Sequence, residues 1–207
     1  DLIDAAIQNG KPDIIVLHEK AWAKKIRNLL NGNYRALREP TQRQWIKKFY
    51  PQLQDIPIKD YWHHETHAAA GVLSSNFNEC AVMVIDAIGE FNTATIWKWK
   101  DGNLKKLHSV NFPSSLGLFY SAVTSHVGLK PMEDEYILMG MSAYGKPIYK
   151  DDIYKDFVVR DPFKLKRNLH KGIGDWKPNA DVMDLAASIQ AVTEECLTDL
   201  WIRASRY

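Results

Sequence analysis

The stretch Trp62-His63-His64-Glu65-Thr66-His67-Ala68-Ala69-Ala70-Gly71, followed by Val84-Ile85-Asp86-Ala87-Ile88-Gly89-Glu90, decides the fold and carries the candidate chemistry. His63 and His67 are four positions apart, so both imidazoles lie on one face of a helix, where they can bind one metal ion. His64 points about 100° away from that face. Asp86 follows an apolar strand and can add a carboxylate ligand. The stretch therefore predicts a helix, a strand and a candidate metal site.

Two histidines at this spacing also have structural interpretations. Such a pair can cap a helix or pack beside an aromatic ring such as Trp62, with no ion bound. The small side chains of Ala68–Gly71 allow the helix to lie close to a sheet, which suits a metal site and simple packing equally. The spacing alone leaves both interpretations open.

The segments around this stretch alternate between helical and strand patterns, which predicts an α/β protein. Strands are expected at 14–17, 81–85, 93–100 and 104–110, the first of them buried on both faces because it is apolar throughout. Asp101-Gly102 predicts a hairpin between the last two. Helices are expected at 2–7, 22–30, 41–49, 116–127 and 181–201, with Ser114-Ser115 and Asp181 as N-caps of the last two. Residues 146–179, rich in proline and glycine, are expected to cross the surface.

Composition limits the class of protein. The chain has 207 residues, 45% hydrophobic and 25% charged, which is enough to bury a substantial core. Its net charge is only +2 and its basic clusters alternate with acidic residues, which argues against a nucleic-acid-binding face. No apolar run is long enough to span a membrane. Cys80 and Cys196, without a CxxC pair, indicate buried thiols in a reducing compartment, so we expect a cytoplasmic protein.

The two ends of the chain suggest part of a longer protein. The sequence opens at Asp1 without a methionine. It closes at Tyr207 within an apparent amphipathic helix that has no stop signal. We therefore expect a fragment.

Four motifs together carry a resemblance to a known family. They are His63-His64-Glu65-Thr66-His67-Ala68, Val84-Ile85-Asp86-Ala87-Ile88-Gly89-Glu90, Phe112-Pro113-Ser114-Ser115-Leu116-Gly117-Leu118-Phe119-Tyr120 and Glu135-Tyr136-Ile137-Leu138-Met139-Gly140-Met141-Ser142-Ala143-Tyr144-Gly145. In order and spacing they resemble the carbamoyltransferase family of nodulation-factor and antibiotic biosynthesis, over about residues 14–200. Four ordered motifs are more specific than any one of them.

This resemblance implies a fold and a domain organisation. The amino-terminal domain of the family resembles the tRNA threonylcarbamoyl-transferring protein and has the actin/sugar-kinase-like (ASKHA) fold, with mixed sheets covered by helices. Residues 1–80 would then be the remainder of a first actin-like half, with the His helix. Residues 81–207 would begin a second half with a surface insertion at about 146–180. Both would be parts of one larger catalytic domain, present as an incomplete fragment.

The resemblance also implies an activity. Family members convert carbamoyl phosphate and ATP into carbamoyl adenylate at a separate carboxy-terminal domain. By this resemblance, the domain seen in this sequence would transfer the carbamoyl group to a hydroxyl of a small-molecule or sugar acceptor. The expected partners are these substrates and the adenylate-forming domain, with neither nucleic acid nor membrane. The 207-residue chain alone is expected to be inactive.

Site residues are carried over from the family position by position. The family's HxxxH histidines and the aspartate after the next strand bind an iron-type divalent metal, and these positions are His63, His67 and Asp86. A bound cation would polarise the carbonyl of the adenylate. His64 is the candidate catalytic acid–base group, and a structural histidine is its alternative. Contacts to the ATP-derived nucleotide are expected at Gly89, Glu90 and Gly140.

Several positions depart from the family pattern. Ile137 stands where the family often has lysine, Ala87 stands where glycine is common, and Ser142-Ala143 replaces Ala-Pro. These departures concern rate and substrate more than fold. Trp176 is a candidate contact for the acceptor.

Two other classes of function remain open. One is threonylcarbamoyl-type transfer to tRNA, which would need a basic face that this sequence does not show. The other is a non-catalytic scaffold that binds a metal or a nucleotide. Metal titration of alanine variants at His63 and His67, followed by an assay with carbamoyl phosphate and ATP on the complete protein, would separate these classes.

Overall fold

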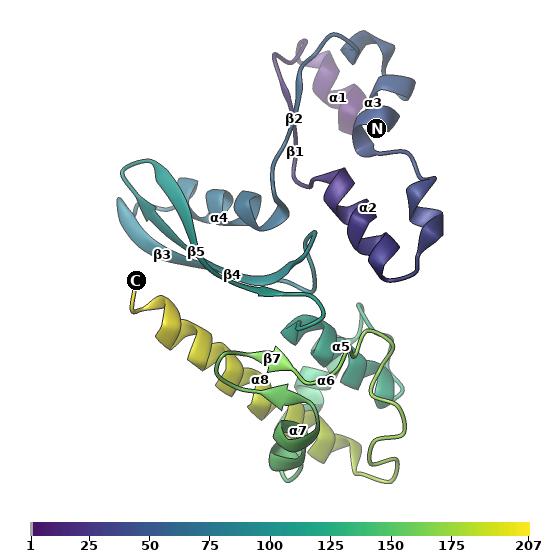
Figure 1. The fold of residues 1–207 in the computed structure, drawn as a ribbon, viewed down its shortest axis with the longest axis vertical. Helices are drawn as coiled ribbons and strands as arrows, with labels where there is room; N and C mark the ends of the chain where they lie inside the picture. The colour runs from purple at the N-terminus through teal and green to yellow at the C-terminus, as the bar shows by residue number, and fades with distance from the viewer. Residues whose placement is uncertain (1) are drawn as a thin grey trace. The chain divides into compact units, whose positions relative to one another are not determined.

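The computed structural model describes residues 2–207, and these group into two compact units. The first unit runs to His67 and includes Gly89–Phe91, and the second comprises Ala68–Ile88 and Asn92–Tyr207. Figure 1 shows the elements of each.

The first unit is built from short helices and one pair of strands. Strands β1 (Ile15–Leu17) and β2 (Ile58–Asp60) are parallel, with Ile15 opposite Ile58. Their core consists of Ile46, Tyr50, Leu53, Ile56 and Ile58. The helices are α1 (Leu2–Gln8), α2 (Ala21–Leu30), α3 (Gln42–Phe49) and the first turn of α4 (His63–Leu73), with 3-10 turns at Tyr34–Leu37 and Pro51–Leu53.

The predicted helices of this unit are confirmed, and their caps explain where they begin. The Thr41 hydroxyl accepts the Gln44 backbone N–H while the Gln44 side chain accepts that of Thr41, so α3 opens with a capping box. The expected strand is also confirmed, but its burial on both faces is wrong. Val16 is 57% exposed, and in the described part of the chain β1 pairs with a single strand, β2, in a two-stranded sheet. The apolar face of α2 is likewise open, with Leu30 76% exposed.

The second unit centres on a three-stranded antiparallel sheet in the order β3-β4-β5. Its strands are β3 (Glu79–Ile85), β4 (Asn92–Lys100) and β5 (Asn103–Asn111), and Cys80 stands opposite Trp99. The predicted hairpin is confirmed. Asp101 and Gly102 both have positive φ, 50° and 76°, as a tight two-residue turn between twisted strands requires.

Helices complete this unit. They are α5 (Leu116–His126), α6 (Glu135–Met141), the 3-10 turn Ser142–Tyr144, α7 (Lys150–Asp156) and α8 (Val182–Ala204). The predicted N-caps are present. The Ser115 hydroxyl accepts the Leu118 N–H, and the Asp181 carboxylate accepts the N–H groups of Met183 and Asp184. Fixed in this way, α5 and α8 supply much of the apolar core.

The segment at 146–180 is part of the core, which differs from the surface excursion expected from its prolines and glycines. It contains α7 and the two-stranded sheet β6 (Val158–Val159) and β7 (Lys164–Leu165). Trp176 packs on the ring of Phe157, at 5.0 Å between centroids, and donates to Asp156 Oδ2. The segment buries the side chains of Ile153, Phe157, Val158, Phe163, Leu165, Leu169 and Ile173.

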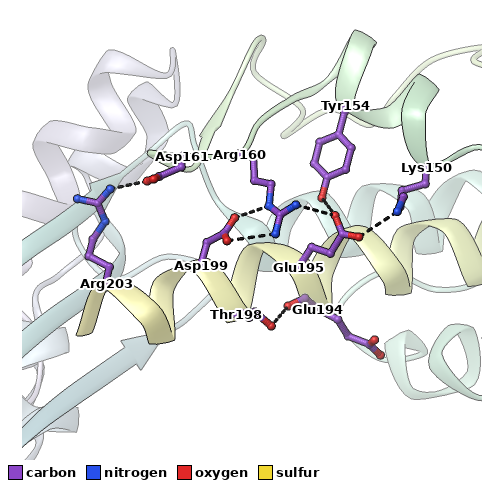
Figure 2. Close-up of polar contacts among 9 residues, drawn as sticks. All are labelled: Lys150, Tyr154, Arg160, Asp161, Glu194, Glu195, Thr198, Asp199 and Arg203. Atoms are coloured by element: carbon purple, nitrogen blue, oxygen red, sulfur yellow. Dashed lines mark hydrogen bonds and ion pairs between the residues drawn. The ribbon is translucent and has the colours of Figure 1, made fainter. Parts of the chain in front are cut away.

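Polar contacts tie this segment to α8 (Figure 2). Glu195 accepts hydrogen bonds from Lys150 Nζ at 3.0 Å and from Tyr154 Oη at 2.7 Å. Arg160 reaches Glu195 at 3.2 Å and also pairs with Asp199. Acidic side chains of α8 thus bind residues of α7 and of the segment that follows α7.

The predicted α/β class is confirmed, since the structure consists of helices and small sheets. Within residues 2–207 no helix is both long and apolar enough to cross a lipid bilayer. Cys196 is buried as predicted, and burial raises the pKa of its thiol to about 12. Cys80 is only partly buried, because it lies on an edge strand of the sheet.

Candidate metal centre

His63 and His67 form a close imidazole pair on the first turn of α4, within the first unit. Their Nε2 atoms are 3.1 Å apart and their ring centroids 4.6 Å, with the planes nearly perpendicular. Two nitrogens that each lie about 2.1 Å from a metal at a right angle would be about 3 Å apart. The pair therefore fits a shared divalent cation of the type that imidazole prefers.

The sequence explains why a helix begins at these histidines. Glu65 places a negative charge in the first turn, where the helix dipole favours it. The Thr66 hydroxyl donates to the carbonyl of His63 at 2.7 Å. The alanines that follow favour the helix and add little bulk. Ala68, in the second unit, is fully buried beside Val84 and Trp97.

Asp86 lies in the second unit, directly after β3. Its backbone N–H donates to Thr93 O at 2.9 Å, and its Oδ1 accepts the Ala87 N–H at 2.6 Å. The side chain is partly buried. Because His63 and His67 belong to the first unit, a site shared by all three residues stays a prediction.

The turn that follows Asp86 is held by the motif at residues 112–120. Ser115 Oγ donates to the carbonyl of Ala87 at 2.6 Å while it also caps α5. A Cβ on Gly117 would lie 3.1 Å from the Cα of Ala87, so this glycine permits the close approach. These contacts give the motif a physical role, which is to position the turn next to Asp86.

A mainly apolar hollow of about 410 Å³ adjoins this turn in the second unit. Glu135 lies in its wall and accepts the Met132 N–H at 2.7 Å and the Ser121 hydroxyl at 2.5 Å. Tyr120 donates to Gln190, and burial raises the pKa of its phenol to about 12. The remaining wall residues include Ile85, Ala87, Leu116, Gly117, Thr193 and Leu197.

His64 is buried, with a side chain only 1% exposed. Its ring centroid is 6.1 Å from that of His63. A catalytic acid or base must reach the substrate, so this burial favours the structural role that the sequence left open. The catalytic role of His64 stays a prediction.

Gly89 and Glu90, both predicted nucleotide contacts, lie beside the histidines in the first unit. A Cβ on Gly89 would be 2.9 Å from Cδ2 of His64 and 3.2 Å from Cβ of His63. Glu90 is 4% exposed, and its carboxylate accepts the backbone N–H groups of Lys20 and His63. Gly140, the third predicted contact, is an exposed residue of α6 in the second unit, with no atom within 4 Å of an added Cβ.

Sequence reasoning missed three residues around this turn. The Arg27 guanidinium donates to the carbonyls of Gly89 and Glu90, the second at 3.0 Å, and burial lowers its pKa. His18 places its ring 5.6 Å from that of His63. Lys20 donates through Nζ to Asp60 O at 3.0 Å. His18 and Lys20 follow a strand end, a position that often carries function, whereas nothing in the pattern of α2 distinguishes Arg27.

These features define a class of protein, an α/β protein with a helix-borne imidazole pair suited to a divalent metal. The family described as carbamoyltransferase N-terminus matches residues 13–203, and the chain belongs to this family. The resemblance read from the four motifs is thereby confirmed.

Individual relatives agree with this family. The chain is 35% identical to an uncharacterized protein of Synechocystis sp. over 184 residues, covering 75% of this chain and 30% of that protein. It is 33% identical to the nodulation protein NolO of Bradyrhizobium diazoefficiens over 95 residues, or 46% of this chain and 17% of NolO. It is 30% identical to the nodulation protein NolNO of Sinorhizobium fredii over 111 residues, or 54% and 16%. The chain thus spans less than a third of the length of each.

Proposed function

We propose that this chain is the carbamoyl-transferring domain of a carbamoyltransferase, and that His63, His67 and Asp86 together hold a divalent, iron-type cation. The observation that carries the proposal is the 3.1 Å separation of the two imidazole nitrogens, in a chain of this family. A carboxylate at a strand end, next to a turn fixed by Ser115, suits the third ligand.

The fold proposed for this function is the actin/sugar-kinase-like one. The three antiparallel strands β3, β4 and β5 followed by helix α5 agree with the start of one half of that fold. In that fold, the turn between β3 and β4 would face a nucleotide phosphate. Backbone N–H groups in a turn of this kind can face an anion.

The proposed reaction transfers a carbamoyl group from carbamoyl adenylate to an acceptor hydroxyl. The acceptor oxygen forms a bond to the carbamoyl carbon, the bond between that carbon and the phosphate oxygen of AMP breaks, AMP leaves, and the hydroxyl proton is released to solvent. Bound at the histidines, the cation would polarise the carbonyl and offset the charge that develops on its oxygen. The imidazole pair would hold the cation on one helical turn, so the charge would already be in place when attack occurs.

The donor and the partner domain follow from the same proposal. Carbamoyl phosphate and ATP would be converted to the adenylate at a carboxy-terminal domain, and the acceptor would be a hydroxylated small molecule or sugar. The hollow lined by Leu116, Tyr120 and Leu197 is mainly apolar, which suits the less polar part of a bound substrate.

Titration of a divalent metal into His63→Ala and His67→Ala tests the metal site. We expect each variant to lose affinity by at least the roughly 10- to 100-fold that loss of an outer-shell partner typically costs, because each removes a direct ligand. His170→Ala is the matched control, since His170 is exposed and the described contact of its ring is with Phe112, while its backbone N–H, which the substitution keeps, donates to Asn168. The measurement is calorimetric titration with Co²⁺ or Fe²⁺ under reducing conditions.

Unchanged affinity in both variants would overturn the metal assignment. Asp86→Asn tests the third ligand in the same way, because the amide keeps the shape of the side chain and removes its charge. Carbamoylation of hydroxylated acceptors is then assayed in a protein that also carries the adenylate-forming domain. A protein that binds metal through the histidines and yet carbamoylates no hydroxylated acceptor would refute the proposed reaction and leave the two alternatives, transfer to tRNA and a scaffold function.

A further inference from the structure

Glu90 links two helix starts that lie far apart in the sequence. Its Oε1 accepts the backbone N–H of Lys20 at 2.7 Å, and Oε1 and Oε2 each lie 3.2 Å from the backbone nitrogen of His63. Lys20 is the N-cap residue of α2, and His63 is the first residue of α4. All of these residues belong to the first unit. One buried carboxylate therefore serves both helices.

Neither helix has a local side chain for this task. The first N–H groups of a helix have no partner within it and are normally capped by a nearby Ser, Thr, Asp or Asn. Lys20 makes no side-chain cap hydrogen bond, and Trp62, just before α4, has no side-chain acceptor. A carboxylate also suits the positive end of a helix dipole. Glu90 thus substitutes for two missing caps.

The backbone on either side of the carboxylate is held as well. Arg27, on α2, donates to the carbonyls of Gly89 and Glu90. The missing side chain at Gly89 leaves room for the rings of His63 and His64, which an added Cβ would meet at 2.9 to 3.3 Å. The first turn of α4 is therefore held at its backbone by Glu90, and the absence of a side chain at Gly89 leaves space for its rings.

From this geometry we propose that Glu90 is a positioning residue for the imidazole pair. By fixing the His63 backbone it sets the direction in which His63 and His67 present Nε2, so it acts through the histidines and does not itself contact the nucleotide. A phosphate next to a buried carboxylate would be repelled, which agrees with this assignment. The metal part of the inference rests on the proposed function.

The test compares Glu90→Gln with Glu90→Ala. Gln keeps an acceptor oxygen for the two N–H groups, whereas Ala keeps none, so the pair separates loss of charge from loss of the anchor. Co²⁺ affinity is measured by calorimetry, and amide hydrogen exchange is measured by NMR at Lys20 and His63. Glu133→Ala is the control, because Glu133 is exposed and pairs only with Lys130 among the described contacts.

We expect Glu90→Ala to weaken Co²⁺ binding by about 10-fold or more, as loss of an outer-shell partner does, and to speed exchange at both amides. Glu90→Gln should retain most of both properties. If Glu90→Ala does not fold, Glu90→Asp replaces it, since a carboxylate shorter by one methylene cannot reach both amides. Unchanged affinity and unchanged exchange in the folded Ala or Asp variant would overturn the inference.

The two readouts separate this inference from the proposed function. A wild-type protein that binds no Co²⁺ would refute the metal site, while the exchange rates would still decide whether Glu90 anchors the two helices. Faster exchange with normal Co²⁺ affinity would show that Glu90 only stabilises the fold, which would refute its positioning role.

Discussion

Gly145 lies where the chain after α6 meets the first turn of α8. A Cβ at this position would overlap the carbonyl of Met183. The adjacent Lys146 N–H donates to Asp184 Oδ1 at 2.7 Å, which holds the two backbones together. Gly140, five positions earlier, has open space around it. Of these two glycines in one motif, only Gly145 lacks the space for a side chain.

We predict that Gly145→Ala destabilises the protein by about 1–3 kcal/mol, because the added methyl overpacks a backbone contact. Gly140→Ala should be neutral or stabilising by up to about 1 kcal/mol, because alanine favours a helix more than glycine does. Urea denaturation of both variants measures the difference. Equal stability of the two variants would contradict this account of the motif.

At the scale of single residues, the residue types and their spacing predicted the candidate site residues, but not the burial or the tertiary contacts of those residues. The spacing of His63 and His67 placed both rings on one helix face, and their nitrogens lie 3.1 Å apart. The burial of His64 beside Gly89 and the hydrogen bond between Lys20 and Glu90, which are 70 positions apart, depend on non-local contacts that no local pattern contains.

Among the elements, α8 has two faces with different roles. Glu195 faces the segment at 146–180, where Lys150, Tyr154 and Arg160 contact it, whereas Glu194 points away from these partners (Figure 2). Hydrogen bonds from Tyr154 and Lys150 lower the pKa of Glu195. Glu195 and Glu194 are adjacent on one helix but differ in their contacts, so substitution of Glu194 is a control for substitution of Glu195.

Glu195→Ala should lower the free energy of unfolding at pH 7 by about 1 kcal/mol, because it removes partly exposed charged hydrogen bonds. Glu194→Ala should have little effect, since its carboxylate accepts only from Gln190 in the described structure. A carboxyl group whose pKa is lower in the folded than in the unfolded state stabilises the fold when the pH is above its unfolded-state pKa. This stabilisation is lost as the pH falls through its folded-state pKa. Denaturation at pH 7 and at pH 3 should therefore show a difference that shrinks in acid, and a difference that grows in acid would contradict the prediction.

Element predictions succeeded where a local signal marked the boundary. Thr41, Ser115, Asp181 and Asp101-Gly102 cap or turn the chain as their side chains and backbone preferences dictate. The segment at 146–180 was misjudged because its apolar residues are spaced irregularly between prolines and glycines. Such residues enter the core through tertiary packing on α8, and periodicity cannot detect that.

For the whole molecule, the chain belongs to the carbamoyltransferase family and spans less than a third of the relatives compared. We predict that the 207-residue chain alone releases no pyrophosphate from carbamoyl phosphate and ATP, since the resemblance assigns adenylate formation to another domain. A coupled pyrophosphate assay measures this, with a protein carrying both domains as the positive control. Pyrophosphate release by the chain alone would contradict the assignment of adenylate formation to a separate domain.

At this scale the sequence predicted the family and the α/β class, because four ordered motifs and alternating helix and strand patterns are properties of the chain itself. The actin-like halves and the three-residue metal site depend on how distant segments are arranged, so they remain predictions. Sequence motifs identify homologous proteins more readily than they determine how distant segments of one chain are arranged in space.

The strand register provides one experimental handle. Cys80 and Trp99 are opposite each other on β3 and β4, so their side chains are neighbours on one face of the sheet. Cys196 is buried and protonated, which leaves Cys80 as the more reactive thiol. A fluorophore attached to Cys80 would rest against an indole that quenches its emission. Fraying of that edge would then appear as brightening, without any engineered labelling site.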